Sequence, residues 1–321
     1  MATRKDVAER AGVSVATVSY VVNKSKNVTP EVKQRVLDAI DALNYRPNLV
    51  ARSLVTQKTR HVAMLVDNLK NPYYCEMLEG AQQIAAEQGY IVSVISVDLS
   101  NEESVLELAS RGVDGVIWAV ANPNVKMKHK IKIPCVTTGD YVFIDYKQAM
   151  YDMVDCLVKN GHSDIAFLSG ITLDPSINFR FKYFVEALKA KGLEVDTDLN
   201  IEVNNDGKTN EESGEIAMET LLEKKTKFSA VFALNDLMAM GAATILRKEG
   251  LSIPEDVSIV GCDHISVLKR MSPSLSTIDT QAFNTGENLM QLLIDTINTA
   301  PKKHQIIKTE FICKESIGKK K

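Results

Sequence analysis

The chain has 321 residues, of which 45% are hydrophobic and 25% are charged, and its formal net charge is −3 at pH 7. This length exceeds the usual size of one domain, so we expect two or three folded units with ample core. The longest apolar runs are far short of the roughly 20 residues of a membrane helix, and the N-terminus lacks an apolar signal segment. Five scattered cysteines form no CxxC pair, and together these features predict a cytoplasmic protein with no membrane partner.

The charge is unevenly distributed along the chain. Residues 1–60 contain eleven Lys/Arg and five acidic residues, a formal charge of +6, which leaves −9 for the remainder. A basic head on an acidic body indicates a polyanionic partner for the head alone, although a basic surface without a partner has the same composition.

The first elements of the head have the spacing of a helix-turn-helix. A short helix is predicted from Asp6 to Ala11, followed by Gly12, where a tight turn requires a positive φ. Ser14 is a suitable N-cap for a second helix over Val15–Asn23. In a helix-turn-helix, this second helix enters the major groove of DNA.

A third helix and a weak linker follow. Thr29 is predicted to cap the helix and Pro30 to occupy its first position, with an inward stripe of Val32, Val36, Ile40 and Leu43. After Asn48, the segment 49–55 is too short for a stable isolated helix, because nucleation is costly below roughly 12–15 residues. We expect it to fold when it meets DNA and a second copy of the chain.

From Arg60 onward, strand-sized apolar runs alternate with helical patterns. The expected strands are Val62–Val66, Ile91–Val94, Gly115–Trp118, Cys135–Thr137, Ile165–Leu168, Glu202–Val203, Ala230–Phe232 and Ser258–Gly261. The expected helices are Tyr74–Glu87, Glu102–Ala109 and the segments near 147–159, 180–191, 211–223 and 236–249. This alternation predicts two α/β lobes with parallel sheets covered by helices on both faces, and a ligand cleft between the lobes.

The head closely resembles the headpiece and hinge of the lac/galactose repressor (LacI/GalR) family. The resemblance is carried by Lys5–Ser14, Thr17-Val18-Ser19, Val21-Val22-Asn23, Tyr45–Asn48 and Ala51-Arg52-Ser53-Leu54. It implies that Val15, Ala16 and Tyr20 read bases, and that Ser14, Thr17, Asn23 and Tyr45 face phosphates. It also implies a hinge helix with Ala51 and Arg52 in the minor groove, where Leu54 wedges between base steps. The alternative for Leu54 is packing within a dimer contact.

The body resembles the sensor core of the same family, which is similar to periplasmic sugar-binding proteins. Matching segments include Asn71–Tyr74, Val113–Ile117, Gly161–Ile165, Asn235–Gly241 and Ile253–Asp263. The resemblance implies that the effector is lined by Tyr73, Tyr74, Arg180, Asn235 and Asp263. Each has a structural alternative: core packing for the tyrosines, a surface ion pair for Arg180 and a turn cap for Asp263.

Several positions depart from the family pattern. Tyr20 stands where Arg or His is usual, so an arginine–guanine contact is not available there. Cys262, His264 and Tyr183 replace usual residues around the expected effector, and the segment between about 122 and 146 is shorter than usual. The operator and the effector therefore cannot be carried over from relatives.

No motif indicates an enzyme, a cofactor or a metal site. GxGxxG, GxxxxGK[ST], HExxH and GxSxG are absent, and the five histidines have no ligand-like spacing. Cys262 and His264 resemble a nucleophile pair, but no third group to orient them is apparent. We predict that the chain is not an enzyme and uses neither a cofactor nor a metal.

The prediction is a transcription regulator, most simply a repressor. The expected domains are a helix-turn-helix domain (1–47), a hinge helix and linker (48–58) and an effector-binding core (59–321), whose N-lobe spans about 59–147 and 279–306 and whose C-lobe spans about 148–278 and 307–321. The expected partners are double-stranded operator DNA, a small-molecule effector such as a sugar, and a second copy of the chain; the homodimer does not exclude a tetramer. The alternatives are control by a partner protein docking on the N-lobe and, from another class, a solute-binding receptor.

Overall fold

The computed structural model describes residues 2–23, 26–46, 58–97, 103, 106–107, 112–120, 130–203 and 207–320. The chain forms two compact units, residues 1–59 and residues 60–321, which we call the headpiece and the sensor unit. Almost all of the hinge segment expected at 48–58 and most of the helix expected at 102–109 lie outside the described residues.

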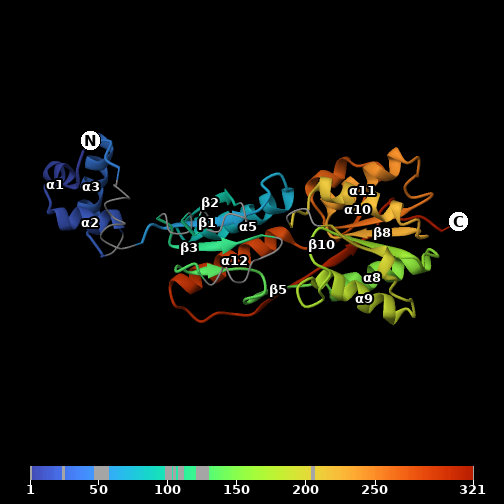
Figure 1. The fold of residues 1–321 in the computed structure, drawn as a ribbon. Coiled ribbons are helices and arrows are strands. Elements are labelled where there is room, and N and C mark those ends of the chain that lie inside the picture. The colour runs from blue at the N-terminus through green and yellow to red at the C-terminus, as the bar shows by residue number, and fades with distance from the viewer. Residues whose placement is uncertain are drawn as a thin grey trace. The chain divides into compact units, whose positions relative to one another are not determined.

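The described part of the headpiece contains three helices, α1 (Arg4–Ala11), α2 (Val15–Asn23) and α3 (Pro30–Ala42) (Figure 1). Gly12 has a φ of 63°, the left-handed conformation expected for the turn. The core gathers Val7, Val18 and Val36, all fully buried, around the small side chains of α1. Small apolar side chains at the helix contacts let the three helices approach closely enough to exclude water.

Three details of the headpiece differ from the sequence prediction. The first helix begins at Arg4 instead of Asp6, because Thr3 and Asp6 form a reciprocal capping box. Thr29 precedes α3 as expected, but its side chain makes no capping hydrogen bond. Val32 is half-buried and lies outside the core cluster, so the inward stripe begins one turn later at Val36.

The first lobe of the sensor unit, the N-lobe, contains a parallel sheet in the order β2-β1-β3-β4. Its strands are β1 (His61–Val66), β2 (Ile91–Ser96), β3 (Gly115–Trp118) and β4 (Cys135–Val136). Two helices, α5 (Pro72–Glu87) and α12 (Ala282–Ile297), cover one face, where Val62 and Met64 of β1 join their core. A second parallel pair, β5 (Val142–Asp145) and β11 (Gln305–Lys308), also belongs to this lobe.

The C-lobe contains a six-stranded sheet in the order β12-β10-β9-β8-β6-β7, in which β12 runs antiparallel to β10 and the other pairs are parallel. Its strands are β6 (Ile165–Ser169), β7 (Asn200–Glu202), β8 (Ala230–Ala233), β9 (Ser258–Asp263), β10 (Ser276–Asp279) and β12 (Glu310–Ile312). Its helices are α8 (Lys147–Lys159), α9 (Phe179–Ala190), α10 (Glu211–Glu223) and α11 (Asp236–Lys248), with 3-10 turns at Thr197–Leu199 and Ser266–Arg270.

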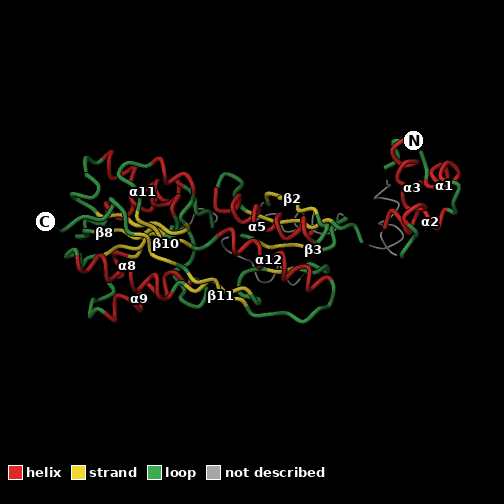
Figure 2. The backbone as a smooth tube through the Cα atoms, turned by 180° about the vertical axis from the view of Figure 1, so that it is seen from behind, coloured by secondary structure: helices red, strands yellow, loops and turns green. Residues whose placement is uncertain are grey.

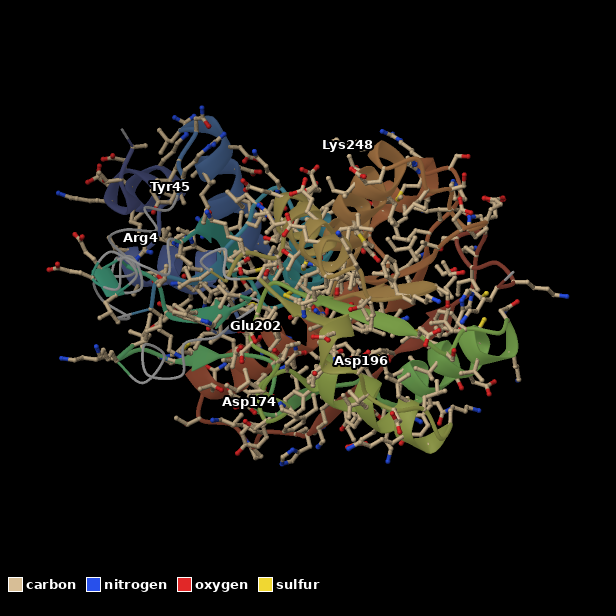
Figure 3. All side chains as sticks on the ribbon, turned by 45° about the vertical axis from the view of Figure 1, so that its right-hand side comes forward. Arg4, Tyr45, Asp174, Asp196, Glu202 and Lys248 are labelled. Atoms are coloured by element: carbon tan, nitrogen blue, oxygen red, sulfur yellow. The ribbon has the colours of Figure 1, made fainter. Side chains whose placement is uncertain are left out.

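Helices cover both faces of the C-lobe sheet, with α8 and α9 on one side and α10 and α11 on the other (Figure 1). Strands β6, β8 and β9 are buried along their whole length. Burial on both faces favours apolar side chains, which is why β6 and β8 contain continuous apolar runs and β9 is apolar between its polar ends, Ser258 and Asp263. The polar end of helix α11 is exposed to solvent, and its Lys248 lies at the surface in Figure 3.

The chain passes between the lobes three times, from β5 to α8, from β10 to α12 and from β11 to β12 (Figure 2). The sequence patterns did not predict β5, β10, β11, β12 or α12 as elements. Four of these are strands of three or four residues, and the partners of β5 and β12 lie far away in the sequence. No local periodicity can reveal such strands.

Each lobe contains two helices whose backbones touch at a pair of glycines. In the N-lobe, a Cβ at Gly80 would lie 2.0 Å from the Phe283 carbonyl oxygen, and one at Gly286 would lie 1.9 Å from that of Met77. In the C-lobe, Gly214 and Gly241 play the same part between α10 and α11. Only a residue without a side chain permits helices to cross this closely.

We expect Gly286→Ala to lower the stability of the sensor unit. Alanine gains up to about 1 kcal/mol in helix propensity, but a Cβ only 1.9 Å from a backbone carbonyl oxygen puts the overpacking cost at the upper end of the usual range, about 3 kcal/mol, so the clash wins. A net loss near 2 kcal/mol lowers the melting temperature by roughly 4–8 °C. Gln291→Ala on the exposed face of α12 is the matched control and should shift it by no more than about 1–2 °C. Equal melting temperatures for the two variants would contradict this account of the helix contact.

Candidate functional site

The first turn of α2 presents a small exposed surface. Ser14, Val15 and Ala16 are all exposed, and Val15 retains 47% of its accessible area. Ser14 caps the helix as expected, because its Oγ accepts a hydrogen bond from the Thr17 backbone N–H at 3.1 Å. Val18 points the other way, into the core. This division leaves the first turn of α2 free to meet another molecule.

The remaining predicted DNA contacts have differing environments. Tyr20 is half-buried, with the Lys26 ammonium 4.8 Å from its ring centroid, and Asn23 is exposed and donates to Ser19 Oγ at 3.1 Å. Tyr45 is only 7% exposed and belongs to the headpiece core, so its ring has a packing role. The predicted hinge contacts Ala51, Arg52 and Leu54 lie outside the described residues.

A cavity of about 850 Å³ lies between the two lobes of the sensor unit. This volume suits a small molecule, since ligand pockets span about 300–1,000 Å³. All five predicted effector residues line it: Tyr73, Tyr74, Arg180, Asn235 and Asp263. The structure therefore brings together side chains from the starts of α5, α9 and α11 and from the end of β9, as expected where parallel strands end.

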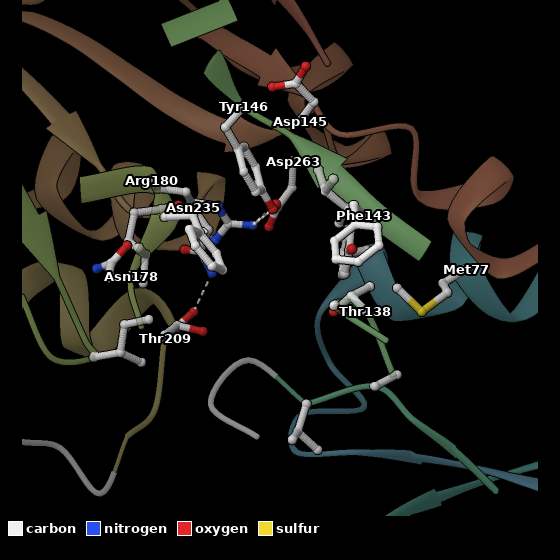
Figure 4. A pocket seen from close by; sticks show the side chains of 18 of the residues that line it. Met77, Thr138, Phe143, Asp145, Tyr146, Asn178, Arg180, Thr209, Asn235 and Asp263 are labelled. Atoms are coloured by element: carbon white, nitrogen blue, oxygen red, sulfur yellow. Dashed lines mark hydrogen bonds and ion pairs between the residues drawn. The ribbon is translucent and has the colours of Figure 1, made fainter. Parts of the chain in front are cut away.

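Arg180, which is half-buried, forms an ion pair with the buried Asp263 at the C-lobe wall of the cavity (Figure 4). Arg180 Nη2 donates to Asp263 Oδ1 at 2.9 Å and to the Tyr146 hydroxyl at 3.2 Å, and Nη1 donates to the Leu234 carbonyl at 3.1 Å. Arg180 Nε is buried and has no hydrogen-bond partner among the described residues. A buried donor without a partner is costly, so the described residues around this guanidinium leave one of its hydrogen-bonding groups unsatisfied.

Burial controls the ionisation of Asp263 and of the neighbouring Tyr146. It raises the pKa of Asp263 to about 7, against the opposing effect of Arg180, and it raises the pKa of Tyr146 to about 12. Asp263 also has a φ of 115°, a conformation that costs energy for a residue with a side chain. The carboxyl is thus held at the cavity wall by the tertiary structure, and not by local preference.

Asn235 and the two tyrosines also serve the local structure. Asn235 caps α11 by accepting from the Met238 N–H at 2.9 Å, and its amide donates to the Thr209 carbonyl at 2.8 Å (Figure 4). Tyr73 and Tyr74 pack edge to face with ring centroids 5.4 Å apart, and Tyr74 is almost fully buried. The two tyrosines therefore pack against their neighbours and also line the cavity.

Sequence reasoning missed the apolar rim of the cavity. Phe143 and Ile306 contribute from β5 and β11, Ile177 lies just before α9 and Phe179 is the first residue of that helix. These four make up half of the exposed large hydrophobic side chains described in the sensor unit. Exposed apolar side chains gathered around one opening indicate a binding surface. Asn178 also lines the cavity, and as an asparagine at the N-cap of α9 it could have been recognised from the sequence. The residues of β5 and β11 carry no such local signal.

Polar contacts also occur where the N-lobe meets the C-lobe near Glu76 and Ser266. Glu76 on α5 accepts from the Ser266 N–H of the C-lobe at 3.2 Å, and His264 Nδ1 lies 3.3 Å from Asp279 Oδ2. That interaction raises the pKa of His264.

Cys262 is fully buried, and burial raises the pKa of its thiol, which disfavours the nucleophilic thiolate. The described residues contain no cluster of three potential metal ligands, and none of their helices is both long and apolar enough to span a membrane.

A helix-turn-helix headpiece joined to a two-lobed unit with a ligand-sized cleft defines a ligand-responsive transcription regulator. Residues 3–48 match the family described as bacterial regulatory proteins, lacI family, and residues 154–317 match the periplasmic binding protein-like domain. The HTH-type transcriptional repressor PurR of Histophilus somni (strain 129Pt) is 32% identical over 99% of both chains. Catabolite control protein A of Priestia megaterium is 34% identical over 91% of this chain and 92% of that protein.

Solved structures show the same architecture. The transcriptional regulator CelR in complex with cellobiose superimposes with a TM-score of 0.71 at 28% identity, over 98% of this chain and 100% of that one. The lac repressor dimer bound to operator and the anti-inducer ONPF has a TM-score of 0.82 over 98% of both chains, and its 23% identity shows a likeness of fold. The chain belongs to the lacI family, and it is a DNA-binding transcriptional repressor with an effector-binding domain.

Proposed function

We propose that two copies of this chain bind a palindromic operator and that a sugar or a related polyhydroxylated metabolite in the cleft controls this binding. The observation that carries the effector assignment is the ion pair between Arg180 and the buried Asp263, which lies at the wall of a cavity with an apolar rim. Among the described residues that line the cavity, Arg180 and Lys147 are cations and Asp145 and Asp263 are carboxylic acids, so their net charge stays between zero and +1 as Asp263 titrates. A neutral ligand with several hydroxyl groups fits this balance, because hydroxyls both donate and accept.

Two relatives support a carbohydrate. The regulator CelR was solved with cellobiose, and a lacI-family regulator from Enterococcus faecium was solved with bound ribose at 25% identity. Aromatic side chains in the cavity wall, such as Tyr73 and Phe143, can stack on the apolar face of a sugar ring. They can equally contact an apolar group attached to that ring.

Control follows from the three chain crossings between the lobes. An effector that contacts both walls favours one angle between the lobes and so changes the geometry presented to the hinge segment. The free energy of this coupling is reciprocal, so operator DNA changes effector affinity by the same factor. The contact between Glu76 and the Ser266 N–H has to adjust to any such rotation, because it links the two lobes.

Operator binding by the full chain tests the DNA part of the proposal. With about 6–10 phosphate contacts, affinity for a palindrome should fall by roughly 10³–10⁵ between 50 and 200 mM salt. Inserting five base pairs at the centre of the palindrome should abolish tight binding, because half-sites separated by whole helical turns are needed for two symmetric headpieces. Binding that ignores either change would contradict the proposal. A response that required a second protein would instead support control by a partner protein.

A further inference from the structure

Two cysteines far apart in the sequence touch in the C-lobe. Cys156 lies on α8 and Cys313 directly follows β12, and their sulfur atoms are 3.5 Å apart. A disulfide requires sulfurs about 2.05 Å apart, so the two must approach by about 1.5 Å, which is within reach of side-chain rotation. From this juxtaposition we propose that Cys156 and Cys313 form a reactive dithiol that low-molecular-weight disulfides oxidise to an intramolecular disulfide.

Rigid elements hold both residues in place. Ile312, beside Cys313, pairs with Thr277 in the sheet, and the Lys314 N–H donates to Ser276 Oγ at 2.9 Å. The Cys156 carbonyl accepts from Asn160 Nδ2 at 2.9 Å at the end of α8. Both cysteines belong to one lobe, so rotation of the lobes during effector binding leaves the pair intact.

The two thiols have different tasks in the exchange. Cys313 is exposed and meets the reagent first, whereas Cys156 is half-buried and its pKa is raised to about 11 by burial and by its contact with Cys313. The Cys313 thiolate attacks one sulfur of the reagent RSSR, forms a mixed disulfide and releases RS⁻. Cys156 gives up its proton and attacks the Cys313 sulfur, so that the protein disulfide forms and a second RS⁻ leaves. Two protein thiols are oxidised, and one RSSR becomes two RSH.

The bond would fasten the C-terminal segment to the lobe. This segment already returns to α8, because Lys320 N–H donates to the Asn160 carbonyl at 2.8 Å and Lys320 pairs with Asp164. A link between positions 156 and 313 closes a loop of more than 150 residues, which restricts the unfolded chain strongly. We therefore expect oxidation to raise the melting temperature by roughly 4–10 °C.

The test uses the full chain and glutathione disulfide as the oxidant, followed by alkylation and peptide mapping. The expected product is lighter by two hydrogen atoms, contains the Cys156–Cys313 cross-link and reverts with dithiothreitol. Cys156→Ser should leave Cys313 as a stable glutathione adduct, and Cys313→Ser should slow the modification of Cys156 at least tenfold. Both variants should lose the rise in melting temperature.

Cys75→Ser is the matched control, since Cys75 is exposed on α5 of the other lobe. It should form the cross-link at the wild-type rate. A wild-type product that remains a Cys313 adduct without the cross-link, or a disulfide from Cys313 to another cysteine in Cys156→Ser, would overturn the proposal. Neither result bears on operator binding, so this test stands apart from the proposed function.

Discussion

Replacing Arg180 by methionine should abolish the response to the effector while the headpiece still binds operator DNA. The guanidinium contacts Asp263, Tyr146 and the Leu234 carbonyl, and its Nε faces no partner among the described residues. Each hydrogen bond from a charged group contributes about 1.5–3 kcal/mol, so losing one contact to the effector weakens binding by roughly 10- to 150-fold. Calorimetric titration with the sugar selected from a thermal-shift panel measures this change.

The same variant should also be less stable. Without Arg180, Asp263 becomes a buried carboxyl with no cation, which costs about 3–5 kcal/mol when one partner of a buried pair is removed. The pKa of Asp263, already raised to about 7 by burial, rises further, so the loss of stability grows as the pH increases through neutrality. A melting curve at pH 6 and pH 8 shows this: the deficit against the wild type is larger at pH 8.

Two further variants separate binding from folding. In Arg180→Met with Asp263→Asn, both charges are removed and asparagine tolerates the positive φ at this position, so much of the stability should recover while effector binding does not. Lys189→Met, on the exposed end of the same helix, should behave as the wild type. If Arg180→Met bound the effector with unchanged affinity, Arg180 would have only a structural role.

Removing residues 1–59 should eliminate operator binding and preserve effector binding. The sensor unit from Arg60 onward is compact by itself and contains the whole cavity. Specific binding exceeds non-specific binding by about 10³–10⁷, and the loss should be at least that lower figure. Gel-shift and calorimetric titrations on the two lengths measure the two affinities. Retained operator binding would place the DNA contacts elsewhere and contradict the assignment of the headpiece.

A single substitution in the full chain should reproduce this loss. Val18 is completely buried in the three-helix core, and a carboxylate there costs several kcal/mol, more than so small a core is expected to withstand. Val18→Asp should therefore unfold the headpiece and abolish operator binding. Leu37→Asp introduces the same charge at an exposed site on α3 and should retain most of the affinity. An equal loss of operator affinity in the two variants would mean that the added negative charge, and not unfolding of the headpiece, weakens DNA binding.

The sequence by itself determined the features that depend on neighbours along the chain. Gly12 in the turn, Ser14 as a cap and Pro30 at the start of α3 are local signals, and each lies where it was expected. Helices α8 and α10 have the predicted bounds, because helical periodicity extends over three turns. Strands such as β6 and β8 were recognisable because burial on both faces demands unbroken apolar runs.

Only the tertiary structure decided the features that depend on residues distant in the chain. Strand β5 is stabilised by β11, more than 150 residues later, and without that pairing neither Phe143 nor Ile306 reaches the cavity rim. The Arg180–Asp263 pair and the contact between Cys156 and Cys313 likewise join segments that carry no sign of each other. The physical reason is that capping and periodicity act within a few residues, whereas cavities and ion pairs arise when separate elements pack together.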